Sequence, residues 1–439
     1  MARIFVSFFS PLGSEKILSY YEGFLNSLAD QGNDVLYSVS NDILSRPWDD
    51  DSQTILGFDK KRFTTALENF KPDVAFIFNN SGVKDLHEII DCPIAIMEAD
   101  LALYYSNKTT LKNNNDKYNY FYTSEKNREM IKDLFSVDDK YIFKINHATA
   151  VNSEFLEKTN NISFIGSAFI VPNEIRNKIK RFKSTDIDLF FTKLKNNPNL
   201  LDGVPISYKE YLNIKSSQDR MYVLQSICDL GLNLYGKGWD DLENTPIDLC
   251  KIFEKKDTYT LKQNQDIYNK SKISINISHA QAADTFPWRV TDILASSSCL
   301  ITQNNQGVKD FLKGYIDIPM YDNIYEVREL CKKVLKDEGW KKEIIDICNK
   351  AIHEKGRWIY NFEKFEEIFD ISFVNNKKGS IKKLESTQFT NEKHLIYLTA
   401  TKASKIIPKP LHIHCYNFLK FMNINFNYDL AKKIQNQDI

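Results

Sequence analysis

Short apolar runs, hydrophobic at nearly every position, alternate with helix-like segments through the first third of the chain. Helices are predicted over about 15–31 and near 60–70, and Ser124 is placed to cap a third. Strands of this continuous kind are typical of a parallel sheet that helices cover on both faces. The alternation therefore predicts a Rossmann-like domain over residues 1–155. Its strands are expected at 3–8, 34–38, 74–78, 92–97 and 118–123.

The same alternation returns after a polar stretch near 147–161. A helix is predicted from about 174 to beyond 180, and a longer helical region covers about 324–360. These elements predict a second Rossmann-like domain over residues 156–375. Its strands are expected at 162–167, 233–239, 273–277 and 300–302.

The composition changes again near residue 376, where the chain becomes polar and basic. Residues 391–439 then mix aromatic side chains with lysines. We interpret 376–439 as a linker and a basic, aromatic tail. Such a segment can lie on an anionic membrane surface, or it can pack against the protein or another subunit.

Bulk composition excludes several classes of protein. Lys+Arg and Asp+Glu both number 58, so no global positive field favours nucleic acid. No apolar stretch approaches the roughly 20 residues of a membrane span. The seven cysteines lack the spacing of a zinc site. We expect a cytoplasmic protein without metal or cofactor, which the tail could hold at the inner face of the cytoplasmic membrane.

The segment 273–302, ISINISHAQAADTFPWRVTDILASSSCLIT, is the densest in chemistry-bearing residues. It predicts a buried strand, a polar loop and then a helix that opens near Trp288. Ligands of open α/β sheets bind where strands end and helices begin. A cation and an imidazole suit a phosphate there, and a carboxylate suits a sugar diol. The candidates are His279, Asp284, Arg289 and Asp292; the alternative for Arg289 and Asp292 is a surface salt bridge.

Two glycine-containing strand ends are further candidates for binding a phosphate. Gly166 and Ser167 end one predicted strand, where a missing Cβ lets the backbone approach a ligand. Gly236 and Lys237 follow another strand and place an ammonium group beside exposed backbone. Both segments could equally be ordinary turns.

In the first domain, two carboxylates directly follow the predicted fourth strand. Glu98 and Asp100 would lie at the carboxyl end of a parallel sheet, and one of them could act as general base on an acceptor hydroxyl. The alternative is structural, with Asp100 capping a helix and Glu98 exposed.

Residues from about 162 to 370 resemble the group-1 type glycosyltransferases related to the spore maturation protein CgeB. The matching motifs are FIGS at 164–167, LYGKGW at 234–239, FPWRVTDILASSSCLIT at 286–302 and the closing HEKGRWIYNFEKFEEI. The resemblance implies a GT-B fold, in which two Rossmann-like domains face each other across a cleft. It implies a nucleotide-sugar on the C-terminal domain and an acceptor on the N-terminal domain.

The resemblance also implies roles for single residues. Arg289 would contact the donor diphosphate, and Asp292 would take the place of the family's ribose-binding glutamate. Asp100 would occupy the position of an acidic residue that follows an N-domain strand. The family pattern RxFExxAxG is only partly kept, and Asp284, eight residues before Asp292, could replace a first glutamate.

These observations predict a metal-independent glycosyltransferase that builds a bacterial surface glycan, such as lipopolysaccharide, capsule or a glycosylated protein. Lys237, His279 and Arg289 would offset charge on the leaving phosphate, and Asp292 would hold the ribose. Two alternatives stay open: a CMP-Kdo-dependent transferase of the same fold, and a non-catalytic glycan-assembly or glycan-binding protein with a degenerate site. A nicotinamide-dependent oxidoreductase is disfavoured because G-x-G-x-x-G does not follow the first strand.

Overall fold

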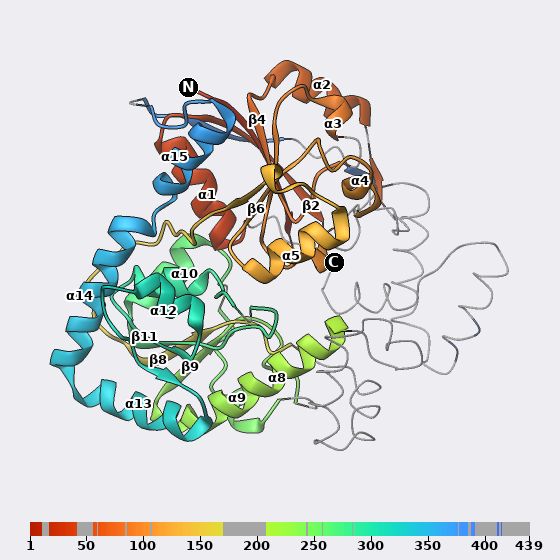
Figure 1. The fold of residues 1–439 in the computed structure, drawn as a ribbon. Helices are drawn as coiled ribbons and strands as arrows, with labels where there is room; N and C mark the ends of the chain where they lie inside the picture. The colour runs from red at the N-terminus through yellow and green to blue at the C-terminus, as the bar shows by residue number, and fades with distance from the viewer. Residues whose placement is uncertain are drawn as a thin grey trace. The chain divides into compact units, whose positions relative to one another are not determined.

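A computed structural model gives the fold in two compact units (Figure 1). The first contains Met1–Asn146 and the described residues from Trp358 onward, and the second is His147–Arg357. The structure describes residues 1–10, 17–41, 56–58, 60–83, 86–105, 108–169, 208–242, 245–256, 258–282, 284–375, 377–384 and 388–390, together with Leu411 and His414.

The first unit is built on a seven-stranded sheet in the order β13-β2-β1-β4-β5-β6-β7. Every pairing in it is parallel. β4 and β5 are buried at every position, as their continuous apolar runs predicted. The strands are β1 (Arg3–Ser10), β2 (Asp34–Asn41), β4 (Val74–Phe78), β5 (Ile94–Met97), β6 (Asn119–Tyr122), β7 (Ile142–Lys144) and β13 (Ser380–Lys383).

Helices pack around this sheet. Ser124 caps α5 as predicted, because its side chain accepts a hydrogen bond from the backbone N–H of Asn127. A separate antiparallel pair joins β3 (Leu56–Phe58) to β14 (Gln388–Thr390). The helices are α1 (Ser19–Asp30), α2 (Lys60–Phe70), α3 (Leu86–Ile89), α4 (Lys108–Asn113), α5 (Glu125–Phe135) and α15 (Trp358–Phe369), with short 3₁₀ turns at Ala102–Tyr104 and Asp139–Tyr141.

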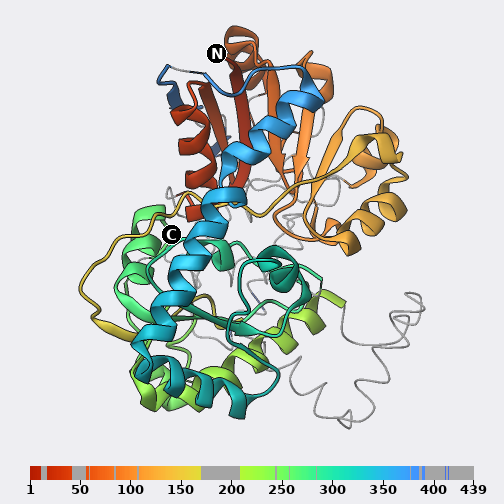
Figure 2. The same ribbon diagram turned by 60° about the vertical axis from the view of Figure 1, so that its left-hand side comes forward.

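The chain returns to the first unit at Trp358, earlier than the boundary at 375 that the sequence suggested. The reason is aromatic packing by α15, which lies beside α1 in Figure 1. The Trp358 ring lies 4.8 Å from Phe24, and Phe365 lies 5.0 Å from Phe76. Farther along, β13 joins the edge of the sheet beside β2. Figure 2 shows α15, in blue, running along the sheet of this unit.

The second unit has a five-stranded sheet in the order β12-β11-β10-β8-β9, again entirely parallel. The strands are β8 (Asn160–Ile165), β9 (Leu232–Tyr235), β10 (Ser271–Asn276), β11 (Cys299–Gln303) and β12 (Met320–Tyr321). Strand order reverses between β8 and β10, since the chain moves to β9 on one side and then to β10 on the other. Such a switch point is where open α/β sheets bind ligands.

The helices of this unit include several that the sequence does not predict, and one of these contributes to the candidate site. That helix, α8, buries Ser216, Arg220 and Leu224 on one face, so polar residues interrupt its apolar stripe. The helices are α8 (Tyr208–Ile227), α9 (Ile247–Lys251), α10 (Leu261–Asn269), α11 (Arg289–Leu294), α12 (Gln306–Leu312), α13 (Ile324–Lys336) and α14 (Glu338–Lys355), with a 3₁₀ turn at Cys228–Leu230.

Two sequence-based predictions lie outside the described residues. They are the helix from about 174 and nearly all of the tail 391–439. None of the helices that the structure does describe combines the length and apolar character needed to cross a membrane.

Candidate functional site

The loops after β8 and β10 form the switch point of the second unit. Gly166 is the first residue after β8. A Cβ on it would lie 2.9 Å from the Phe164 ring and 3.3 Å from Nη1 of Arg289. Glycine at this position therefore allows the guanidinium group of Arg289 to approach the end of the strand.

Two arginines converge on Phe164. The guanidinium of Arg289 lies 5.3 Å from the centre of that ring, and the guanidinium of Arg220 lies 5.5 Å from it. Arg220 also lies 4.1 Å from the Phe169 ring and donates a hydrogen bond to the carbonyl oxygen of Ser167. The two side chains come from α11 and α8, and so the fold brings together residues far apart in the sequence.

The two guanidinium groups repel each other in a poorly solvated place. Arg220 is 2% exposed, and burial together with the charge of Arg289 holds the pKa of Arg220 well below its ordinary value. Among the described residues, no carboxylate lies within ion-pair distance of either arginine, and Nε of Arg220 has no hydrogen-bond partner. A bound anion would offset both charges and supply an acceptor for this N–H.

His279 lies beside the arginines in the loop after β10. Its Nδ1 accepts a hydrogen bond from the backbone N–H of Gln281, so its proton is on Nε2, 3.0 Å from Oδ1 of Asn213. Burial, followed by the charges of Arg220 and Arg289, lowers the pKa of His279 to about 4. The lowered pKa favours the neutral imidazole, so His279 would offset phosphate charge by donating a hydrogen bond from Nε2.

Asp292 lies in the first turn of α11, where the sequence placed it. It is 9% exposed and accepts a 2.5 Å hydrogen bond from Oγ1 of Thr149. Burial raises its pKa to about 6, although Thr149, Arg289 and Arg357 favour its charged form. Asp284 is exposed, and its carbonyl oxygen would be 3.1 Å from a Cβ added to Gly307 in α12.

The Gly-Lys-Gly turn after β9 braces the loop after β8. Gly236 has φ of +119°, and a Cβ there would lie 2.2 Å from the carbonyl oxygen of Gly166. Trp239 donates from Nε1 to that same oxygen over 2.7 Å. The ammonium group of Lys237 lies 4.7 Å from the ring of Tyr259, and burial lowers its pKa. The structure thus places Lys237 on an aromatic ring, and Gly236 in close backbone packing.

A pocket of about 530 Å³ adjoins His279 at the carboxyl ends of β10, β11 and β12. Its walls combine polar and apolar side chains in about equal measure. Asn304 donates to Asp322 over 2.9 Å, and Lys215 pairs with Asp219 at 3.4 Å. The lining residues are Leu212, Lys215, Asp219, Tyr222, Val223, Ser278, His279, Ala280, Ala282, Gln303, Asn304, Asn305, Tyr321, Asp322, Asn323 and Ile324.

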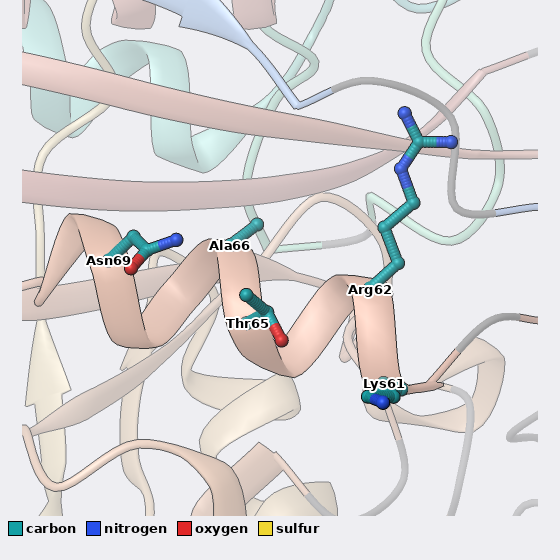
Figure 3. Close-up of a pocket in the computed structure, with 5 residues that line it drawn as sticks. All are labelled: Lys61, Arg62, Thr65, Ala66 and Asn69. Carbon is teal, nitrogen blue, oxygen red and sulfur yellow. The ribbon is translucent and has the colours of Figure 1, made fainter.

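A second hollow, of about 500 Å³, lies on the first unit beside α2 (Figure 3). Its described lining comes from this one helix, with Thr65, Ala66 and Asn69 along it and the long side chain of Arg62 extending from it.

Sequence analysis missed Arg220 and its neighbours on α8. Asn213, Ser216 and Arg220 are three and four positions apart and so share one face of the helix. Asn213 contacts His279, and Oγ of Ser216 accepts from the backbone N–H of Ala280 over 2.8 Å. The spacing of these polar residues at three and four positions is visible in the sequence. It identifies a site only when the partners of each side chain are known.

In the first unit, the two predicted carboxylates have different surroundings. Glu98 is 8% exposed and accepts hydrogen bonds from the backbone N–H and the hydroxyl of Thr123, at 2.8 and 3.1 Å. Burial raises its pKa to about 7. Asp100 is half-buried and accepts from Nδ2 of Asn79 over 2.8 Å. Glu98 therefore stabilises the start of α5, and Asp100 is the more accessible carboxylate.

Comparison with known proteins agrees with this architecture. Residues 220–362 match a family described as glycosyl transferase-like. The structure of a sucrose-phosphate synthase from Thermosynechococcus elongatus aligns with a TM-score of 0.50 and 10% identity, covering 84% of this chain and 100% of that one. The fold is therefore GT-B with two Rossmann-like units, as predicted. The matched segment contains α13 and α14 and includes Arg220, His279, Arg289 and Asp292.

Other solved structures show weaker likeness. A glycosyltransferase from Rickettsia africae aligns with a TM-score of 0.45 and 10% identity over 84% of this chain and 100% of that chain. A mutant of the phage T4 protein BGT, in complex with UDP-glucose, aligns with a TM-score of 0.48 and 10% identity over 84% of this chain and 99% of that chain. No curated protein matches the chain significantly.

Proposed function

We propose that this protein is a metal-independent glycosyltransferase of the CgeB-related group-1 type, which moves a sugar from a nucleotide-sugar to an acceptor hydroxyl. One observation carries the proposal: Arg220 and Arg289 meet at the β8–β10 switch point, within the segment that matches glycosyl transferase-like proteins. Two adjacent guanidinium groups at such a point suit a diphosphate.

The donor then binds as follows. Its diphosphate lies between the two arginines, which stabilise the charge that develops as the sugar leaves. Asp292 accepts from a ribose hydroxyl, while Thr149 holds its other oxygen in place. A diphosphate donor accounts for both arginines better than a monophosphate donor such as CMP-Kdo does.

The sugar of the donor is assigned to the 530 Å³ pocket beside His279. Amide and carboxylate side chains there, including Gln303, Asn304 and Asp322, can donate to and accept from sugar hydroxyls. The pocket adjoins the anion site through His279, so a single ligand can occupy both.

The acceptor hydroxyl is deprotonated by Asp100 of the first unit, since the oxygens of Glu98 are taken up by Thr123. We retain a bacterial surface glycan or glycoprotein as the acceptor, and contact of residues 391–439 with the inner face of the cytoplasmic membrane. The lysines and aromatic residues of that tail support the membrane contact.

The proposal is tested by a thermal-shift screen with UDP, GDP, dTDP and CMP, followed by assays of sugar release from the nucleotide-sugars that bind. We expect one nucleoside diphosphate to raise the melting temperature and its sugar conjugate to be hydrolysed slowly without acceptor. Binding without turnover of any conjugate would instead favour a non-catalytic glycan-binding protein. Stabilisation by CMP alone would favour a CMP-sugar donor.

A further inference from the structure

Asn79 and Asp100 occupy neighbouring strand ends in the first unit. Asn79 directly follows β4, and Asp100 lies three residues after β5 ends at Met97. The two strands are parallel neighbours in which Phe78 pairs with Met97. The backbone N–H of Asn79 donates to the carbonyl oxygen of Met97 over 3.0 Å, which holds the two loops together.

The side chain of Asn79 makes three hydrogen bonds to the segment that carries Asp100. Its Oδ1 accepts from the backbone N–H groups of Ala99 and Asp100, both at 2.9 Å. Its Nδ2 donates to Oδ2 of Asp100 over 2.8 Å. Because backbone N–H groups can only donate, Oδ1 must face them, and the NH₂ group is therefore directed at the carboxylate.

The backbone is left-handed at Asn79 and Asn80 in this arrangement. Asn79 and Asn80 both have positive φ, 49° and 54°, which side-chain-bearing residues rarely adopt. Asn79 is 6% exposed. Aspartate tolerates this conformation and could accept both N–H groups equally well. What asparagine adds is one donor aimed at a carboxylate.

We propose that Asn79 is a positioning residue for Asp100: it sets the direction of the carboxylate and holds it ionised, ready to accept a proton from the acceptor hydroxyl. The catalytic part rests on the proposed function. Among the described residues, two other titratable groups lie near this corner. Glu98 precedes Asp100 on the same loop, and the buried phenol of Tyr105 lies within the electrostatic reach of both carboxylates.

The decisive variant is Asn79→Asp, which keeps both acceptor contacts but replaces the donor with a second carboxylate oxygen. Carboxyl-carbon NMR titration measures the pKa of Asp100, with the signal assigned by its loss in Asp100→Asn. We expect Asn79→Asp to raise that pKa by about 2 units. Asn79→Gly, which suits positive φ and removes the side chain, should raise it by about 1 unit and serves if the aspartate variant does not fold.

The control is Asn115→Asp, the same substitution in the same unit, at a side chain that donates to the carbonyl oxygen of Ser136 over 2.7 Å. It should leave the pKa of Asp100 unchanged. If the Asn79 variants also leave it unchanged, or if Asn115→Asp shifts it as much, the proposal is overturned.

Activity assays distinguish a failure of this proposal from a failure of the proposed function. In Asn79→Asp, the acidic limb of the kcat profile should move upward with the Asp100 pKa, while the KM for the donor stays the same. A shifted pKa with an unmoved limb would overturn the catalytic role of the pair. If the wild-type protein transfers or hydrolyses no nucleotide-sugar, the proposed function fails, and the NMR titration still decides whether Asn79 controls Asp100.

Discussion

Arg220 and Arg289 are placed so that their positive charges oppose each other: the charge of Arg289 is one of the causes that depress the pKa of Arg220, after burial. Both guanidinium groups lie over one aromatic ring. Two cations held this way cost stability in the empty protein and contribute it when an anion binds. Several measurable consequences come from this pair and from the buried carboxylates.

Arg220→Met should separate binding from folding. Replacing a buried cation by an apolar side chain of similar length should leave the free energy of unfolding within about 1 kcal/mol of wild type. Nucleotide affinity should fall by about 10- to 100-fold, because a charge-assisted hydrogen bond is lost. Calorimetric titration and denaturant unfolding measure the two quantities.

The matched control is Arg328→Met in the same unit. Arg328 pairs with Asp229 at 2.5 Å on the protein surface. This variant should bind nucleotide as wild type does. Undiminished nucleotide affinity in Arg220→Met would remove Arg220 from the anion site.

Asp292 should make donor affinity depend on pH. Its pKa is about 6, and its ionised form is the better acceptor for ribose hydroxyls. Below pH 6, the Kd for a nucleotide-sugar should therefore rise by up to about tenfold per pH unit. The Asp292→Asn variant should bind more weakly and show no such dependence. A wild-type Kd that is flat between pH 5 and pH 7 would contradict the ribose role.

Asp292 should also make the free energy of unfolding depend on pH. Its folded pKa is raised, so the folded protein binds more protons than the unfolded chain between about pH 4 and 6. The stability of wild type relative to Asp292→Asn should therefore be greatest below about pH 4 and fall as the pH rises to 6. Urea unfolding of both proteins across this range checks the sign, and a difference that increases with pH would refute it.

Substitutions of Glu98 and Asp100 should differ in their effect on kcat. Asp100→Asn is expected to lower kcat by about 10²–10⁴-fold, as loss of a general base does. Glu98→Gln should retain most activity, because an amide oxygen can still accept from Thr123. Since burial raises the pKa of Glu98 to about 7, wild-type stability relative to Glu98→Gln should fall between about pH 4.5 and 7. Inactivity of a folded Glu98→Gln protein would reverse the assignment.

His279 should act without changing its charge. With a pKa of about 4, it stays neutral throughout the range of most assays. His279→Gln should lower donor affinity by about tenfold or less and leave the shape of the pH–rate profile unaltered between pH 5.5 and 8. A limb near pH 6.5 that disappears in His279→Gln would show that the imidazole titrates in the working enzyme.

Much of the fold could be predicted because its signals are local. Parallel strands covered on both faces are apolar at consecutive positions, and the sequences of β4 and β5 show this pattern. The strand–loop–helix segment around His279 and Arg289 and the helix cap at Ser124 could also be predicted, because their signals lie within a few neighbouring residues. The sequence by itself thus determined the two Rossmann-like units and one half of the candidate site.

The tertiary structure decided those features that depend on contacts between residues far apart in the sequence. The polar strand Ser380–Lys383 has no apolar pattern, and only its pairing with β2 makes it part of a sheet. Arg220 looks like a surface residue on a polar helix until Phe164 and Phe169 bury it. The charge states of His279 and Asp292 likewise follow from desolvation and from charges brought near by folding. Hydrophobic spacing reports which face of an element is buried, but not which groups meet there.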